Sequence, residues 1–143
     1  QEYILHVASE SASDANRGLA TPEAMAIILK YWAPNQVLVV WAPQLVTPGG
    51  ASGHTVCRPY YRNLPNYVEA VFMTTSGSTT TLAHEMGHVL MHCGHCESPG
   101  TDPVNCSCAR PGNLMFGDGD LRVPNPTLTP GQGEALRSSP YAR

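Results

Sequence analysis

Charged residues are scarce in this sequence of 143 residues. Asp, Glu, Lys and Arg make up 13% of it, and Lys30 is its single lysine, whereas average proteins contain roughly 25% charged residues. The formal net charge is -3. A protein that binds nucleic acid usually carries a basic stripe or patch. We therefore expect no nucleic-acid partner.

Long apolar runs are also missing. The longest, residues 37–43, is far shorter than the roughly 20 residues that cross a bilayer as a helix, so we expect no membrane partner. The residues that follow Gln1 show neither the basic segment nor the apolar core of a signal peptide. We expect any signal or pro-segment to have been removed.

The length and the apolar content predict one domain. With 143 residues and 42% hydrophobic residues, the chain can bury about two thirds of its unfolded surface in a single core. We expect one monomeric domain over residues 1–143, with an N-terminal part (1–92) and a C-terminal part (93–143).

Five cysteines are the main clue to the compartment. Cys93, Cys96, Cys106 and Cys108 lie close together, and Cys57 stands apart. In a loop-rich chain with 13 glycines and 13 prolines, this usage favours disulfides in a secreted, extracellular protein. At most two bridges can form, in a pairing that the sequence leaves open. A second, structural zinc site is the alternative, although the unequal spacing disfavours it.

Hydrophobic patterns and capping signals predict an α+β chain. Strands are expected at Tyr3–Ala8, buried on both faces, and at Gln36–Trp41, Thr55–Arg58 and Asn66–Thr74. Helices are expected from Thr21 to about Trp32, from Thr80 to His92, and from Thr129 to about Ser138. Glycine, proline and asparagine dominate residues 93–126, so we expect no regular element there.

Histidines cluster on the second predicted helix. Four of the six lie between positions 84 and 95. Residues four apart on a helix are rotated by about 40° and separated by about 6 Å, so His84 and His88 can bind one zinc ion from the same face. Glu85, next to His84, can reach a zinc-bound water without being a ligand. In this His-Glu-x-x-His arrangement the glutamate is the general base.

The ordinary alternative is that these are satisfied polar residues on an amphipathic helix. From average amino-acid usage, the three residues at this spacing arise by accident in roughly one chain of this length in a few hundred. The same helix also carries apolar residues, as a buried helix would. A buried face with two unpartnered imidazoles is costly, which favours Zn²⁺ as their partner.

A catalytic zinc site needs a third protein ligand and an open position for water. If the helix continues, the Cα atom of His92 lies about 12 Å from that of His84, which does not suit a tetrahedral site. Gly94 can end the helix in a left-handed conformation and fold the next side chain back. We therefore expect the metal ligands to be His84, His88 and His95.

These motifs resemble the metzincin clan of zinc endopeptidases. The resemblance covers roughly residues 80–138 and rests on the histidine helix, on Asn113-Leu114-Met115-Phe116, and on Leu128-Thr129-Pro130-Gly131-Gln132. In that clan a methionine turn lies under the metal, and Met115 matches that position. The last of these segments is similar to small secreted bacterial members.

The resemblance implies a fold and an activity. The fold is zincin-like: a small mixed sheet with a backing helix and an active-site helix, then an irregular, disulfide-stapled part ending in a helix. The activity is that of a secreted zinc metalloendopeptidase formed by a single metallopeptidase domain, with a protein or peptide substrate. Zinc activates a water molecule, and Glu85 takes its proton and passes it to the leaving amine.

The chain departs from the clan at the third ligand. The clan places a glycine and then the ligand where this chain has Met91 and Gly94, so His95 lies one residue further along. Glu134, on the last predicted helix, is the main rival, because another zincin class uses a later glutamate. Cys96 and Asp102 are weaker alternatives.

Two further expectations concern substrate and transition state. Val68–Met73 precedes the active-site helix as the substrate-binding edge strand does in the clan, and an extended peptide can add to such an edge; the alternative is an internal strand. Tyr141 could stabilise an oxyanion, although a lone tyrosine more often packs. Asp118-Gly119-Asp120 reads as a turn rather than as a calcium site.

Two other functions stay open. One is a binding module, stabilised by zinc or disulfides, whose site is catalytically inactive. The other is a zinc hydrolase that acts on something other than peptides, because water activation does not specify the substrate.

Overall fold

The computed structural model describes residues 3–8, 19–47, 50–57, 63–64, 68–91, 112–116 and 125–142. They form an α+β protein, as the sequence predicts at that coarse level. By its internal contacts the chain divides into two compact units, Gln1–Ser78 and Thr79–Arg143. The helix that carries His84 and His88 therefore belongs to the same unit as the C-terminal residues, whereas we expected it in the N-terminal part.

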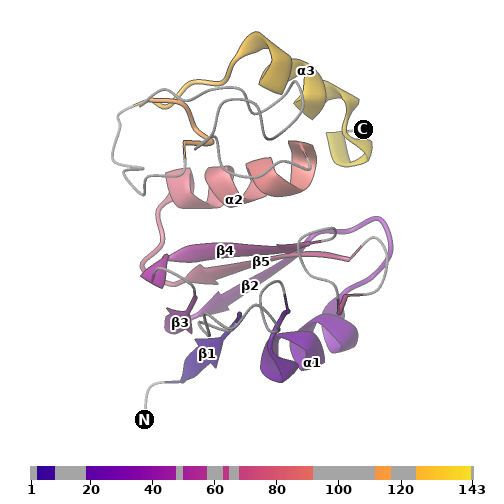
Figure 1. The fold of residues 1–143 in the computed structure, drawn as a ribbon, viewed down its shortest axis with the longest axis vertical. Helices are drawn as coiled ribbons and strands as arrows, with labels where there is room; N and C mark the ends of the chain where they lie inside the picture. The colour runs from indigo at the N-terminus through magenta and orange to yellow at the C-terminus, as the bar shows by residue number, and fades with distance from the viewer. Residues whose placement is uncertain are drawn as a thin grey trace. The chain divides into compact units, whose positions relative to one another are not determined.

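The elements follow one another along the chain as Figure 1 shows. The strands are β1 (Ile4–His6), β2 (Leu38–Ala42), β3 (Gln44–Val46), β4 (Gly53–Cys57) and β5 (Glu69–Thr74). The helices are α1 (Pro22–Tyr31), α2 (Thr79–Met91) and α3 (Pro130–Ser138), followed by the 3-10 turn η2 (Pro140–Ala142). All three predicted helices and all four predicted strands are confirmed within a few residues, and β3 was not predicted.

The described residues of the first unit form two small sheets. In the larger, β5 lies in the middle, parallel to β2 on one side and antiparallel to β4 on the other. In the smaller, β1 pairs with β3 in parallel. Every residue of β5 is buried. The expectation that Val68–Met73 is a substrate-binding edge strand is therefore wrong, because both backbone edges of β5 already pair with neighbouring strands.

The core of this unit lies between the strands and α1. Phe72 of β5 and Ile28 of α1 are fully buried in one hydrophobic cluster. Thr21 caps α1 by accepting a hydrogen bond from the amide of Ala24 at 3.1 Å. β1 contributes only one face: Leu5 is buried but Ile4 is 44% exposed. The prediction that this strand is buried on both faces is wrong, since β1 is covered on one side only by the described residues.

The second unit packs α2 against the turn at residues 112–116 and α3. Met91 and Met115 are its buried hydrophobic centre. The partly buried residues packed against them are Leu114, Leu128, Ala135 and Leu136. α3 begins with the predicted capping box, in which Thr129 and Gln132 each accept a backbone hydrogen bond from the other. Met91 of α2 thus packs with the segment that the sequence linked to a methionine turn.

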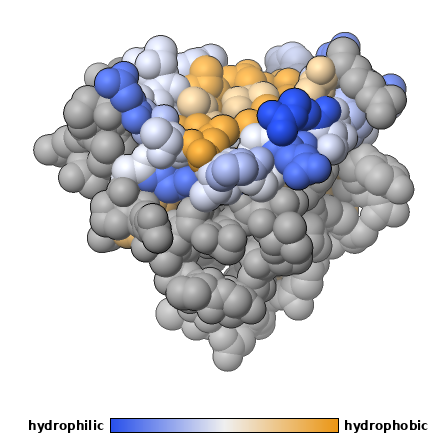
Figure 2. Space-filling view, turned by 90° about the horizontal axis from the view of Figure 1, so that it is seen from above, coloured by the Kyte–Doolittle hydropathy of each residue, from blue (hydrophilic) through white to orange (hydrophobic). Residues whose placement is uncertain are grey.

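The described surface is mixed in polarity. In the view of Figure 2, hydrophobic residues gather in one patch that hydrophilic residues border. Folded proteins expose much apolar area, so such a patch does not by itself define a site. Among the described residues, no helix combines the length and the apolar character needed to cross a bilayer. Four of the five cysteines lie outside the described residues, and the predicted disulfides with them.

Candidate metal centre

Helix α2 presents two imidazoles to the same point. His84 and His88 lie four residues apart and are 4% and 8% exposed. Their Nε2 atoms are 3.1 Å apart, and their rings meet edge to face with centroids 4.7 Å apart. Glu85, between them in sequence, is 7% exposed. The spacing that predicted a shared metal thus brings the two nitrogens together.

The hydrogen bond at the other side of the His84 ring fixes its tautomer. The Nδ1 atom of His84 lies 2.6 Å from the backbone carbonyl oxygen of Leu114. A carbonyl oxygen can only accept, so Nδ1 carries a hydrogen, and in the neutral ring Nε2 then carries the lone pair. Imidazoles that bind metals are commonly held in this way, with the second nitrogen donating to a carbonyl or carboxylate. The neutral ring of His84 therefore presents an Nε2 lone pair that can bind a metal.

The separation of the two nitrogens suits zinc. Bonds of about 2.0–2.1 Å at a tetrahedral angle place two nitrogen ligands about 3.3–3.4 Å apart. The observed 3.1 Å corresponds to an angle of about 98° at a zinc ion bonded at those lengths to both atoms. A shift of a few tenths of an ångström would give the ideal value. The pair fits two corners of a zinc site.

Met115 packs directly beneath the helix turn between the two histidines. It is fully buried. A Cβ atom added to Gly87 would lie 2.3 Å from the Sδ atom of Met115 and 3.1 Å from its Cε atom. Only a residue without a side chain allows this approach. Gly87 and Met115 therefore hold α2 against the turn whose carbonyl group orients His84.

A pair of buried amides fixes that turn in place. Asn113 and Gln132 are 8% and 0% exposed. The side chain of Asn113 donates to Gln132 Oε1 at 2.9 Å, and Gln132 Nε2 donates back to Asn113 Oδ1 at 3.2 Å. Asn113 Oδ1 also accepts from the amide of Met115 at 2.9 Å, and Gln132 Oε1 from that of Thr129 at 2.8 Å. The pair joins the start of α3 to the turn.

The backbone around the turn is held independently as well. Leu114 donates its amide hydrogen to the carbonyl of Thr127 at 2.8 Å, and Thr127 donates to that of Gly112 at 2.9 Å. Gly112 has a φ of 95°, which favours glycine. These two hydrogen bonds hold the backbone of the turn, whose Leu114 carbonyl group contacts His84.

The structure leaves the third ligand to prediction. His95, His92, Cys96 and Asp102 lie outside the described residues. Glu134 is exposed on α3, and within the described ranges no third histidine, cysteine, aspartate or glutamate joins a metal-binding group. Tyr141 lies in η2 and is partly buried. The described residues bring His84 and His88 together and do not bring Glu134 to them.

Leu114, Asn113 and Gln132 were not predicted as functional residues. The sequence marked Gln132 only as a capping residue and Asn113 only as the start of the methionine turn. Their contacts join positions 30 and 19 residues apart, and no periodicity reports contacts at that range. An amide at the third position of a capping box, together with an asparagine just before the turn methionine, was the available signal.

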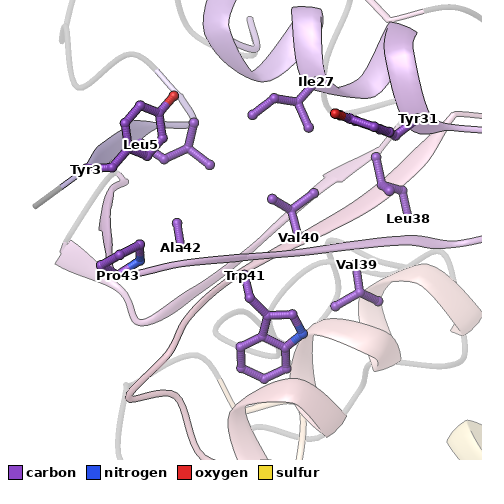
Figure 3. A pocket seen from close by; sticks show the side chains of 10 residues that line it. All are labelled: Tyr3, Leu5, Ile27, Tyr31, Leu38, Val39, Val40, Trp41, Ala42 and Pro43. Carbon is purple, nitrogen blue, oxygen red and sulfur yellow. The ribbon is translucent and has the colours of Figure 1, made fainter.

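A concave surface lies in the first unit. It has a volume of about 630 Å³. Ten residues line it: Tyr3, Leu5, Ile27, Tyr31, Leu38, Val39, Val40, Trp41, Ala42 and Pro43. In Figure 3, Ile27 and Val40 point toward one another, whereas Trp41 points to the other side of β2. This apolar groove contains none of the predicted site residues.

No protein-family model, curated protein or solved structure matches the chain. The functional conclusion therefore rests on the residues and their geometry.

Proposed function

We propose that this chain is a secreted zinc-dependent endopeptidase whose metal centre contains His84 and His88, with His95 as the third ligand. The observation that carries the proposal is the convergence of two buried Nε2 atoms at 3.1 Å, one of them on a ring whose Nδ1 hydrogen is already committed to the Leu114 carbonyl. The zincin-like fold and the metzincin resemblance belong to the same proposal.

Residues of α2 have different roles in the proposed reaction. A bound zinc ion would lower the pKa of a water ligand toward about 7 and polarise the scissile carbonyl group. Glu85 accepts a proton from the attacking water and donates it to the leaving amine nitrogen. It follows His84 directly on the helix and is itself largely buried. This position lets the carboxylate act as a base without serving as a ligand.

The reaction needs no covalent intermediate on the protein. Water attacks the peptide carbonyl carbon, the C–N bond breaks, and the products are a carboxylic acid and an amine. The proton that water loses ends on the amine, so atoms and charge balance. His84 and His88 stay fixed during this sequence, the first through the Leu114 carbonyl. Because the ligands are already held in place, little besides the proton has to move during the reaction. Such preorganisation lowers the activation free energy.

The test compares the purified protein with a Glu85→Gln variant. We expect the unaltered protein to bind one zinc ion and to hydrolyse casein or gelatin. The variant should retain zinc and lose activity by about 10²–10⁴-fold, the usual contribution of a general base. A matched control is Gln36→Glu, an exposed residue outside α2, which should change neither property.

Two results would contradict the proposal. One is full hydrolysis by Glu85→Gln, which would remove the assigned base. The other is one bound zinc ion without turnover of any of many peptide substrates, which would favour an inactive binding module. Hydrolysis of esters or of non-peptide amides, but not of peptides, would instead indicate a hydrolase of another substrate class.

A further inference from the structure

Asn113 and Gln132 are polar residues in a position where apolar side chains could fill the core. Two amide side chains are buried together in the second unit and bonded to each other twice. A hydrophobic pair would fill the same space without needing partners. What the amides add is direction: each bond holds one backbone group at a defined angle. One of these backbone groups is the amide of Met115, which belongs to the same peptide group as the Leu114 carbonyl.

The connection runs through atoms within hydrogen-bond distance. Gln132 is anchored by the amide of Thr129 and grips Asn113 through both of its polar atoms. Asn113 in turn holds the amide of Met115. Leu114 lies between Asn113 and Met115 in sequence, so its peptide planes are fixed at both ends. Its carbonyl oxygen lies 2.6 Å from Nδ1 of His84.

We propose that Asn113 and Gln132 are positioning residues of the metal centre: together they hold the Leu114 carbonyl that selects the Nδ1–H tautomer of His84. This inference rests on the proposed function. Their loss would let the turn rotate and release His84 to the other tautomer, whose Nε2 carries a hydrogen and cannot bind zinc. Hydrogen-bond partners of metal-binding histidines typically change metal affinity by about 10–100-fold when they are replaced.

Gln132→Glu breaks the pair without changing its shape. A carboxylate can still accept from the amide of Thr129 and from Asn113 Nδ2. Its second oxygen then faces Asn113 Oδ1, where Gln132 now donates at 3.2 Å. If the Asn113 amide turns over to avoid this repulsion, it loses the bond to Met115. In either arrangement one bond that fixes the turn is lost.

Gln132→Met is the uncharged companion variant. It keeps the approximate volume and removes every side-chain hydrogen bond of Gln132, so it separates the effect of the bonds from that of a buried charge. Gln36→Glu, at an exposed position of the first unit, adds the same charge elsewhere and is the control for net charge.

Two measurements are needed. Competition with a chelator of known affinity gives the zinc dissociation constant of each protein. Long-range ¹H–¹⁵N correlation spectra of the metal-free proteins give the tautomer of His84. We expect zinc affinity about 10–100-fold weaker in both Gln132 variants, with a mixture of His84 tautomers. The unaltered protein and Gln36→Glu should both show the Nδ1–H form and equal affinity.

The outcomes separate the two proposals. If the unaltered protein binds zinc and both Gln132 variants match its affinity within twofold and keep the Nδ1–H tautomer, the positioning role is wrong. A loss of folding stability with unchanged tautomer and affinity would equally contradict it, because that is what a merely structural pair produces. If the unaltered protein binds no zinc, the proposed function itself fails.

Discussion

At the scale of single residues, the candidate centre depends on one backbone oxygen. The Leu114 carbonyl lies 2.6 Å from His84 Nδ1 and thereby decides which ring nitrogen carries hydrogen. The His88 Nε2 atom lies 3.1 Å from that of His84, within a few tenths of an ångström of the separation of two tetrahedral zinc ligands. Both imidazoles are buried on α2.

Tyr3 and Glu23 provide a residue-scale prediction about pH. The Tyr3 hydroxyl group donates to Glu23, which also accepts from the amide of His6 at 3.1 Å. The hydrogen bond from Tyr3 lowers the pKa of the Glu23 carboxyl group, and the bond to Glu23 raises the pKa of the Tyr3 hydroxyl group above 10.0.

The two shifts define a plateau of stability. A lowered carboxyl pKa stabilises the fold above the unfolded pKa, and this contribution is lost as pH falls through the folded value. A raised hydroxyl pKa stabilises it below the unfolded pKa, and this is lost as pH rises through the folded value. Tyr3→Phe should therefore lower the free energy of unfolding at neutral pH, and the difference should shrink toward both extremes.

Urea unfolding at several pH values checks this prediction. Tyr31→Phe is the matched control, because Tyr31 is exposed and its ring contact with Lys30 survives the loss of the hydroxyl group. It should unfold like the unaltered protein throughout. A Tyr3→Phe effect that does not vary with pH would show that the coupling to Glu23 contributes nothing.

Residue-scale chemistry was predictable where it was local. The spacing of one helical turn was enough to pair His84 with His88, whereas the role of Glu85, inferred from its adjacent position, stays a prediction. The Leu114 carbonyl could not be found in this way, since it lies in a turn whose position depends on tertiary packing. Asn113 and Gln132 were visible only as turn and cap residues for the same reason.

At the scale of elements, two helical glycines should respond in opposite directions to alanine. In α2, a Cβ atom on Gly87 would come within 3.1 Å of both the Met115 Cε and Met91 Cε atoms, and closer still to Met115 Sδ. In α3, a Cβ atom on Gly133 meets only Arg137 Nη1, at the ordinary distance of 3.6 Å.

We expect Gly133→Ala to stabilise the protein by up to about 1 kcal/mol, the helix preference of alanine over glycine. Gly87→Ala gains the same preference, but the added atom overpacks a buried core at a cost of about 1–3 kcal/mol. The net change should be a loss of up to about 2 kcal/mol. Midpoints of urea unfolding measure both. Equal and favourable shifts would mean that Met115 does not pack on Gly87.

The helices were more predictable than the sheets. Thr21 and Thr129 mark the starts of α1 and α3 by hydrogen bonds that close within three residues, so the sequence alone reveals them. Strand order depends on distant pairing. β5 proved central rather than an edge because β2 and β4 reach it from opposite sides, and β3 was missed because it is short and follows β2 after Pro43.

At the scale of the whole molecule, zinc should stabilise the folded chain. A ligand that binds only the folded state adds about 2.7 kcal/mol when its free concentration is 100 times its dissociation constant. Thermal unfolding should therefore move upward by several degrees with zinc and return with EDTA.

Two variants make this measurement specific. His84→Ala combined with His88→Ala should abolish the thermal shift. His6→Ala removes an exposed histidine of β1 and should leave it intact. A shift that persists in the double variant would place the stabilising zinc ion elsewhere in the chain.

The arrangement of ligands around zinc tests the central claim most directly. We predict that a crystal structure of the zinc-loaded protein shows the metal bonded to Nε2 of His84 and of His88 at about 2.0–2.1 Å, with a solvent oxygen in one remaining position. A metal enclosed by four protein side chains, or bound without these two histidines, would contradict the account.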